Sequence, residues 1–165
     1  RLRVGYMPQK FGLYEDLSHD HKHPTTQPLE RRIVEADEDV ATRLGVDVGE
    51  KVLYLRRLRL SDGAPVALME NYIPREFDSI TDAQLVDHGL YQLMRAQGAT
   101  MKVARQTIGA RHPNAQERKL LDMFPSDPVL TMDRIAYDNS GQAIEVGHHA
   151  YRPDLYNIEV TLVDR

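Results

Sequence analysis

Cysteine is absent from this chain of 165 residues. The chain therefore has no disulfide framework and no thiolate chemistry. No apolar run approaches the ~20 residues of a membrane-spanning helix, and no leader of the signal-peptide type is present. Catalytic motifs are also missing: there is no G-x-S-x-G, no H-E-x-x-H and no Gly-rich phosphate loop. These absences favour a cytoplasmic domain with no membrane partner, no cofactor and no catalytic residues.

A positive charge excess is missing as well. The chain has 21 Lys+Arg against 25 Asp+Glu, a formal charge of -4, and it lacks the basic stripe typical of a domain that grips nucleic acid. Hydrophobic residues make up 41% and can supply the core of about one domain. The first residue is Arg1, so we interpret the chain as a fragment or processed product that does not itself bind DNA specifically.

Residues 1–26 are interpreted as a linker or arm, because the polar run SHDHKHPTTQ and the neighbouring prolines and glycines break any periodicity. His19, His21 and His23 alternate there, which raises the possibility of a metal site. A structural metal site wants four ligands at suitable spacing, often including cysteine. We therefore favour a solvated loop and expect no metal.

Residues 27–165 are interpreted as one folded domain of strands and helices. Stretches rich in Val, Leu and Tyr suit strands, while Asp37 and Asn114 are suited to cap helices and Gly45 to end one. Predicted strands are 28–35, 52–60, 65–74, 101–111, 129–137, 143–151 and 158–163. Predicted helices are 38–44, 89–97 and 115–123, with a short helical piece within 77–88.

The order of these elements contains an internal repeat. Val52 follows Leu44 by eight residues, Val129 follows Leu121 by the same distance, and each valine opens a strand that leads through an Asp/Gly turn into another strand. The pattern predicts two copies of strand-helix-strand-strand. We expect an α+β fold, an internally duplicated antiparallel sheet with helices on one side and a pocket between the halves.

The main functional question is whether the arginines in the hairpin of residues 52–74 bind an anion. Side chains alternate across a strand, so Arg57 and Arg59 share one face. Two arginines flanked by apolar residues either are solvated or meet an anion.

The turn of this hairpin decides which residue faces Arg57. A two-residue loop at 62–63 would put Glu70 on the face of Arg57, whereas a three-residue loop sets Arg57 opposite Met69. A slip of one residue flips every side chain, so only one register can hold. Pro65 cannot donate to the ladder and favours a bulged position. We therefore predict the longer loop, with Met69 beside Arg57.

The second hairpin places Glu145, Gly147, His149 and Tyr151 on a common face. Glu145 and Tyr151 can hydrogen-bond to hydroxyls or amines, and Gly147 between them leaves room for a ligand. The alternative is a solvent-facing polar strip on an edge strand.

The start of the predicted helix at 89–97 is a candidate anion site, because free backbone N–H groups and the helix dipole favour negative charge. Gly89 lets a ligand approach the backbone closely. We predict that Arg57 and Arg59 form the anion site together with the amides of Gly89, Leu90 and Tyr91.

Three segments carry a family resemblance: LGVDVGEKVLYLRRLRLSDGAPVALMENYIP, GLYQLMRAQGA and LLDMFPSDPVLTMDRIAYDNSGQAIEVGHHAYRPDLYNIEVTL. They resemble the UTRA domain, the effector-binding domain of HutC-type regulators in the GntR family of bacterial transcription factors. The resemblance covers roughly residues 27 to 164. It implies a chorismate-lyase-like fold, a small-molecule pocket, a homodimer, and operator binding through a winged-helix domain that would precede residue 1.

The resemblance also implies roles for single residues. Family members that bind phosphorylated sugars hold the phosphate with paired strand arginines, which match Arg57 and Arg59. Gly89 stands where the family has a serine, and Met69 where it often has a glutamate. An anionic effector with an apolar part is therefore expected. The expected ligand-binding residues are Arg57, Arg59, Met69, Gly89, Leu90, Tyr91, Glu145, His149 and Tyr151.

Two other functions stay open on sequence grounds. One is a lyase-type enzyme on the same fold, in which arginines and Glu145 would hold a dicarboxylate. The other is a dimerisation module with a vestigial pocket.

Overall fold

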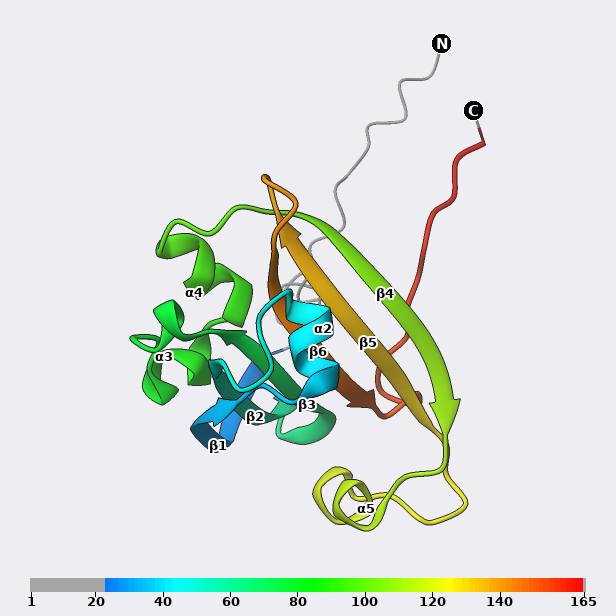
Figure 1. Cartoon of the computed structure of the whole chain (residues 1–165). Helices are drawn as coiled ribbons and strands as arrows, with labels where there is room; N and C mark the ends of the chain where they lie inside the picture. Colours follow the sequence, from blue (N-terminus) through cyan, green and yellow to red (C-terminus); the bar gives the residue numbers. More distant parts are fainter. Residues whose placement is uncertain (1–22, 165) are drawn as a thin grey trace.

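The computed structural model describes residues 23–164, and its centre is one six-stranded antiparallel sheet (Figure 1). The strands lie in the order β1-β2-β3-β6-β5-β4, so the last strand pairs with the third at the middle of the sheet. The predicted α+β class is confirmed. The strands are β1 (Pro24–Glu35), β2 (Lys51–Ser61), β3 (Ala64–Pro74), β4 (Met101–Arg111), β5 (Val129–Asp138) and β6 (Ala143–Tyr151).

The helices are short and begin and end at the residues that local chemistry favours. Asp37 caps the first by accepting a hydrogen bond from the Val40 amide, and Gly45 ends it with φ of +70°. Asn114 caps the last in a reciprocal capping box with Glu117. The helices are α2 (Glu38–Leu44), α3 (Asp82–Asp87), α4 (Leu90–Ala96) and α5 (Ala115–Leu121), with a 3-10 turn η1 at Arg75–Phe77.

The internal duplication is visible in this topology. β1-α2-β2-β3 is followed by β4-α5-β5-β6, and the two halves join where β3 pairs with β6. The predicted repeat of strand-helix-strand-strand is therefore confirmed. The insertion between the repeats supplies α3 and α4.

The prediction of helices on one side needs correction, because helices cover both faces of the sheet. α2 and α5, the helices of the repeat, pack against side chains such as Val52 and Leu58 on one face of β2. α3 and α4 pack against Leu53 and Leu55, which alternation places on the opposite face of the same strand. The sheet is thus the middle layer, and a site on either face can be roofed by a helix.

The β2–β3 hairpin has the predicted facing pairs but not the predicted loop. Its turn is the two-residue loop 62–63, in which Asp62 and Gly63 both have positive φ (50° and 81°), as a hairpin of this length requires. A bulge in β3 just after Pro65 then shifts the register, and Arg57 lies opposite Met69. Met69 is therefore the neighbour of Arg57, while Glu70 lies opposite Arg56 on the other face.

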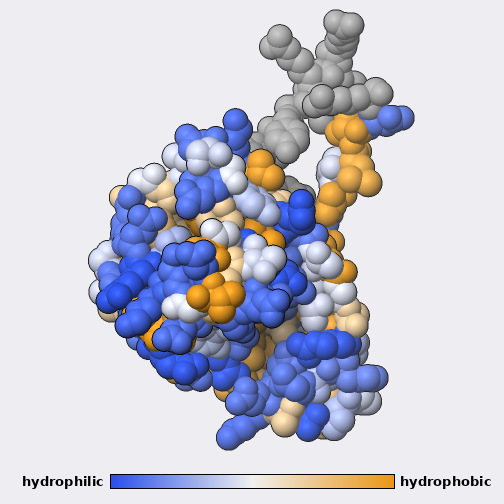
Figure 2. All heavy atoms as spheres, in the orientation of Figure 1, coloured by the Kyte–Doolittle hydropathy of each residue, from blue (hydrophilic) through white to orange (hydrophobic). Residues whose placement is uncertain are grey.

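One predicted boundary and one predicted strand were wrong. Most of the predicted arm, residues 1–22, lies outside the described residues, but β1 begins already at Pro24 and includes the end of that arm. Residues 158–163 form no strand, although they alternate in the manner of one, because no neighbouring strand pairs with them. Ile158 packs against the cluster of Met69 and Tyr151. The later apolar side chains, Val160, Leu162 and Val163, stand exposed, with Leu162 at 87%, and Figure 2 shows this end of the chain projecting from a mostly hydrophilic body.

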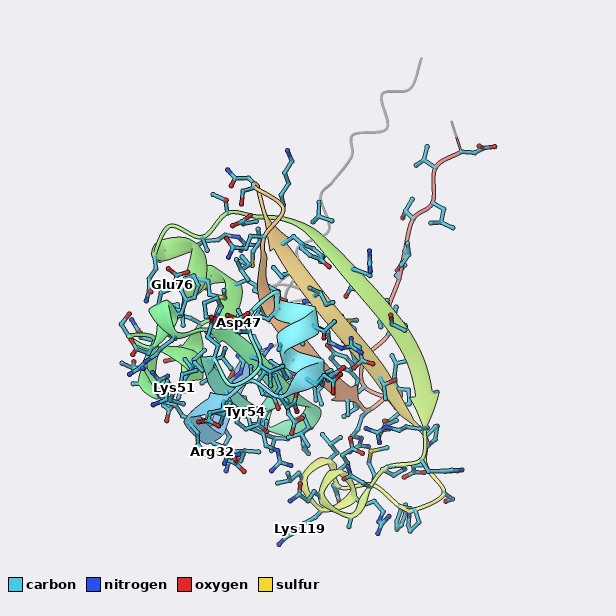
Figure 3. All side chains as sticks on the ribbon, viewed as in Figure 1. Arg32, Asp47, Lys51, Tyr54, Glu76 and Lys119 are labelled. Atoms are coloured by element: carbon cyan, nitrogen blue, oxygen red, sulfur yellow. The ribbon has the colours of Figure 1, made fainter. Side chains whose placement is uncertain are left out.

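The periphery is polar. Lys51, Glu76 and Lys119 are exposed and lie around the rim of the domain, and Arg32 of β1 covers the ring of Tyr54 with 5.3 Å between guanidinium and ring centroid (Figure 3). Within residues 23–164, the helices are too short to cross a membrane.

Leu55 tests how the α3–α4 layer is held. Its side chain is fully buried between β2 and the helices of that layer, so Leu55→Ala removes contacts and leaves a cavity. We expect a loss of about 2–5 kcal/mol in the free energy of unfolding, measured by chemical denaturation. Val48→Ala, at a side chain that is 68% exposed, serves as the control and should change stability by less than about 0.5 kcal/mol. Equal effects of both variants would contradict this packing.

Candidate functional site

The predicted site residues of the sheet do lie on one face, the face covered by α3 and α4. Arg57 pairs with Met69, Met69 pairs with His149, and residues two apart on each strand share the face. The sheet therefore brings the two hairpins together as the sequence predicted. The predicted sheet residues on this face are Arg57, Arg59, Met69, Glu145, His149 and Tyr151.

Arg57 is buried and only partly satisfied. It is 3% exposed, and one Nη2–H donates to Asn71 Oδ1 at 2.6 Å. Nε and Nη1 are both buried and have no hydrogen-bond partner within the described chain. Burial lowers the pKa of Arg57 to about 10, opposed by the negative charge of Glu145. At neutral pH the guanidinium therefore stays charged while two of its donors are without an acceptor.

Glu145 is the carboxylate at the centre of the network. It is fully buried; Asn71 Nδ2 donates to Oε1 at 2.7 Å, and the Tyr91 hydroxyl donates to Oε2 at 2.6 Å. Burial raises the pKa of Glu145, and the hydrogen bond from Tyr91 and the charge of Arg134 act against that rise. The two hydrogen bonds tie β3 and α4 to β6.

Asn71 was missed by the sequence reasoning, although it joins the two halves of the site. Its side-chain oxygen accepts from Arg57 and its nitrogen donates to Glu145, with His149 Nε2 a further 3.4 Å contact. An asparagine in a strand gives no motif. The available signal was its position two residues after Met69, on the face of Arg57.

Arg134 is a third arginine of this face that the predicted site did not include. Its Nη1–H donates to the Tyr91 hydroxyl at 3.1 Å, its guanidinium lies 5.5 Å from the Tyr91 ring centroid, and Nη2–H donates to Gln106 Oε1 at 2.7 Å. It occupies the position in β5 that Arg57 occupies in β2, five residues after the opening valine. The repeat therefore held a signal for it.

His149 and Tyr151 form a second buried pair beside Met69. His149 Nδ1 lies 2.7 Å from the Tyr151 hydroxyl, and the Tyr151 ring stacks on Tyr156 at 4.9 Å between centroids. Burial lowers the pKa of His149 well below its usual value, and the charges of Arg134 and Arg57 act in the same direction. The imidazole is neutral, and its surroundings are partly apolar.

Two sequence interpretations of β6 are corrected here. β6 is a central strand, so Glu145 and His149 do not form a solvent-facing strip on an edge. Gly147 does not leave free space either, because a Cβ at that position would lie 2.6 Å from Glu145 Oε1 and 3.1 Å from His149 Nε2. The glycine makes room for its neighbours' side chains.

The remaining predicted residues take different places. Arg59 is buried and its Nη1–H donates to the Thr26 hydroxyl of β1. The sequence did not predict this partner, because residues 1–26 were interpreted as an arm outside the domain. Leu90 packs in the apolar cluster under α4, and Gly89 is the N-cap residue of that helix. The role of the Gly89 and Leu90 amides stays a prediction, and Tyr91 is the residue that brings α4 to Glu145.

The possible metal site at His19, His21 and His23 lies largely outside the described residues, which include only His23 of the three. Among residues 23–164, no group of three His, Cys, Asp or Glu side chains is arranged to hold a metal ion.

The fold is that of the ligand-binding domains of transcriptional regulators. The family model of the UTRA domain matches residues 19–157, and the chain belongs to the UTRA domain family. It is an effector-binding domain of GntR-type regulators.

Known relatives agree with this placement. The chain is 30% identical over 135 residues to the HTH-type transcriptional regulator GgaR of Escherichia coli, covering 82% of this chain and 54% of that protein. A putative transcriptional regulator from Streptomyces coelicolor is similar, with 40% identity, a TM-score of 0.82 and coverage of 87% of this chain and 96% of that one. The effector domain of PhnF from Mycobacterium smegmatis is also similar, with 28% identity, a TM-score of 0.86 and coverage of 95% of this chain and 98% of that one. The chain spans about half the length of the curated relatives it matches.

The buried neutral His149 predicts a pH dependence of stability. In the unfolded chain a histidine takes up a proton below pH about 6.5, whereas folded His149 does not. The unfolded state then binds more protons, so stability falls as the pH falls below that value, by up to about 1.4 kcal/mol per pH unit. His149→Gln should reduce this slope in urea titrations between pH 5.0 and 6.5, while His112→Gln, at an exposed site, should not. An unchanged slope in His149→Gln would contradict the assignment.

Proposed function

We propose that this domain senses a small anionic metabolite, which binds on the α4-covered face of the sheet at Arg57. The observation that carries the proposal is the pair of buried Arg57 donors, Nε and Nη1, that have no acceptor within residues 23–164. A buried donor left unpaired costs about 1–3 kcal/mol, and more for a charged group. The side-by-side donor pairs of a guanidinium are Nε with Nη2 and Nη1 with Nη2. A carboxylate, phosphate or phosphonate of a ligand would therefore accept from Nε or Nη1 and from Nη2, where it meets the hydrogen bond to Asn71.

The effector should also carry an apolar part. Met69 lies opposite Arg57 in the sheet and belongs to a cluster with Met132 and Tyr151. Methionine side chains are flexible and adapt to different apolar surfaces. An anion joined to an apolar group therefore fits this site, because its apolar part can lie against the Met69 cluster while its anion bonds to Arg57.

The hydrogen-bond chain suggests how binding changes the domain. Asn71 links Arg57 to Glu145, and Glu145 holds Tyr91 of α4. A ligand anion at Arg57 competes with Asn71 for the guanidinium and repels the Glu145 carboxylate. Coupling requires different ligand affinity for two states, and the two states proposed here differ in whether α4 is tied to β6.

We infer that the whole regulator contains more than this domain. A second domain outside this chain would bind operator DNA, and the effector would alter the spacing of two such domains in a cytoplasmic homodimer. The names of the relatives as transcriptional regulators support a sensing role without turnover of the ligand.

Arg57→Ala tests the site. Removal of the buried cation should cost about 2–5 kcal/mol of binding free energy for an anion that the wild type binds. A thermal-shift screen of sugar phosphates, phosphonates, amino acids and dicarboxylates finds that anion, and calorimetry then measures both affinities. Arg56→Ala is the matched control, because Arg56 is the neighbouring arginine on the opposite face. Unchanged affinity in a folded Arg57→Ala protein would overturn the site.

The homodimer has its own test. β4 is an edge strand of eleven residues whose outer side is unpaired within the described chain, and Val103 and Ile108 on it are exposed. Sedimentation equilibrium at micromolar concentration should give twice the monomer mass of 18.9 kDa. A monomer under these conditions would count against the dimer.

A further inference from the structure

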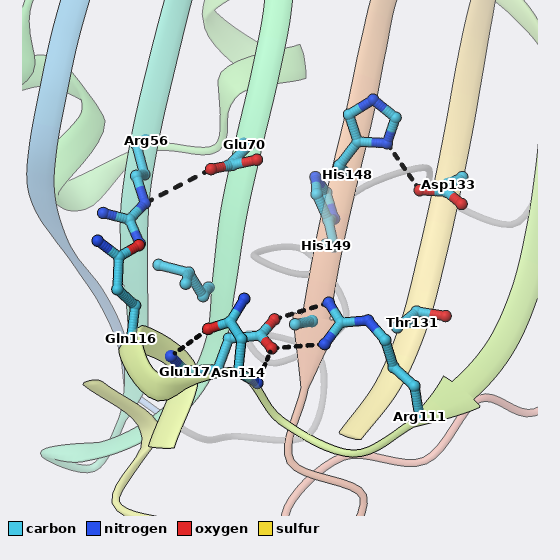
Figure 4. A pocket seen from close by; sticks show the side chains of 12 residues that line it. Arg56, Glu70, Arg111, Asn114, Gln116, Glu117, Thr131, Asp133, His148 and His149 are labelled. Carbon is cyan, nitrogen blue, oxygen red and sulfur yellow. Dashed lines mark hydrogen bonds and ion pairs between the residues drawn. The ribbon is translucent and has the colours of Figure 1, made fainter. Parts of the chain in front are cut away.

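The cleft on the face of the sheet opposite Arg57 is lined by charged side chains that pair with one another (Figure 4). It lies beside α5 and has a volume of about 370 Å³. Its pairs are Arg56 with Glu70 at 3.6 Å, Arg111 with Glu117 at 2.5 and 2.9 Å, and His148 with Asp133 at 2.7 Å. Contacts within the domain thus occupy the charges of the cleft, and Arg111 at the end of β4 is held by α5.

The edge strand β4 offers a regular backbone edge to a partner. It pairs with β5 from Val103 to Arg111 without interruption, and its outer side pairs with no strand among residues 23–164. The other edge strand, β1, has a bulge at Pro28, and prolines and bulges block pairing at a sheet edge. β4 contains no proline, so its outer N–H and C=O groups can accept another strand.

The side chains of β4 select the kind of strand that it can accept. Lys102, Arg105 and Arg111 make β4 basic, and its sequence has no Asp or Glu. A second β4 laid against this edge would bring like charges together, whereas an acidic strand would be attracted. Val103 and Ile108 are 55% and 46% exposed and lie on opposite faces. A fitting strand therefore brings both acidic and apolar side chains.

The C-terminal segment 158–164, with the sequence IEVTLVD, is a strand of this kind. Its two charged residues, Glu159 and Asp164, are both acidic. Its apolar side chains alternate as in a strand, and those beyond Ile158 are more than half exposed: Val160, Leu162 and Val163. Burial of these side chains against another surface would stabilise a complex.

This segment is anchored to its own domain at its beginning. Tyr156 stacks on Tyr151 with 4.9 Å between ring centroids, and Ile158 packs against the cluster that contains Met69. Beyond that point the chain, red in Figure 1, extends past the sheet and does not pair with β4 of its own domain. Residues 159–164 span about 20 Å when extended, which is enough to lie along an edge strand of another protomer.

We propose that residues 158–163 of each protomer add as a strand to the outer edge of β4 in a second copy of this chain. In a two-fold dimer each protomer then gives one strand and receives one. Backbone hydrogen bonds supply affinity, and the side chains fix which face of the strand points where. This strand exchange rests on the homodimer proposed above, and it identifies the surface by which the two copies associate.

The side chains of the two strands match when their faces are aligned. The face of Leu162 fits the face of Ile108, because both are apolar. Alternation along both strands then puts Glu159 on the face of Arg105. Opposite charges on neighbouring strands stabilise a sheet, so one alignment satisfies the apolar and the charged side chains together.

Amide hydrogen exchange of the whole chain, measured above and below the dimer dissociation constant, tests this pairing. In the dimer, alternate amides of residues 159–163 donate to β4 and should exchange at least tenfold more slowly than in the diluted monomer. Protection that persists on dilution would place the segment on its own chain and overturn the exchange. A dimer without this protection would overturn the exchange alone, and a monomer at every concentration would contradict the homodimer as well.

Substitutions in the segment test the apolar contacts. Val160→Lys combined with Leu162→Lys should raise the dimer dissociation constant at least tenfold in sedimentation equilibrium. Circular dichroism should stay unchanged, because both side chains lie outside the core. Val48→Lys, at another exposed apolar side chain, is the control and should leave the dimer unchanged. Equal weakening by the control, or an unchanged dimer in the segment variant, would contradict the exchange.

A charge exchange between two chains distinguishes a second copy from the same chain. Glu159→Lys and Arg105→Glu should each weaken the dimer about tenfold, because each brings like charges together twice in one dimer. An equimolar mixture of the two variants should dimerise about as tightly as the wild type, since opposite charges then meet at both contacts. A mixture no tighter than its components would overturn the exchange. Calorimetry of anion binding reports on the Arg57 site separately, so failure of either proposal is distinguishable.

Discussion

The burial of charged side chains on the middle strands governs the whole arrangement of this domain. Arg57 and Glu145 are both removed from water, and isolated charges in such a place are very costly. Asn71 reduces this cost by bonding to both at once. The balance is incomplete, since Arg57 retains unpaired donors. An incomplete buried network is expected where a ligand completes it, because protein alone tends to satisfy such groups.

The duplication explains where this network lies. Joining two copies at β3 and β6 places the hairpins of both halves, β2–β3 and β5–β6, next to each other in the middle of the sheet. Both faces of these strands are then shielded by helices, α2 and α5 on one side and α3 and α4 on the other. Each face consequently carries its own polar row: a buried network under α4, and a charged cleft beside α5.

The sequence predicted the strands, the repeat and the face of Arg57 because these follow from alternation and short-range turn chemistry. Met69 was placed correctly although the loop was wrong, since a bulge after Pro65 restored the register that a longer loop would have given. Asn71 and the strand-like residues 158–163 were misjudged for another reason. A hydrogen-bond partner or a pairing strand is a property of the three-dimensional neighbourhood, and no local pattern records it.

Completion of the Arg57 hydrogen bonds by an anion can be seen in a crystal structure of the domain with the tightest-binding anion from the metabolite screen. We expect one anion oxygen to accept from Nη2 of Arg57 and a second from Nε or Nη1, with the Asn71 side chain moved from its place between Arg57 and Glu145. An anion bound in the cleft beside Arg56 and Arg111, with the Arg57–Asn71–Glu145 chain unchanged, would contradict a sensing site at Arg57.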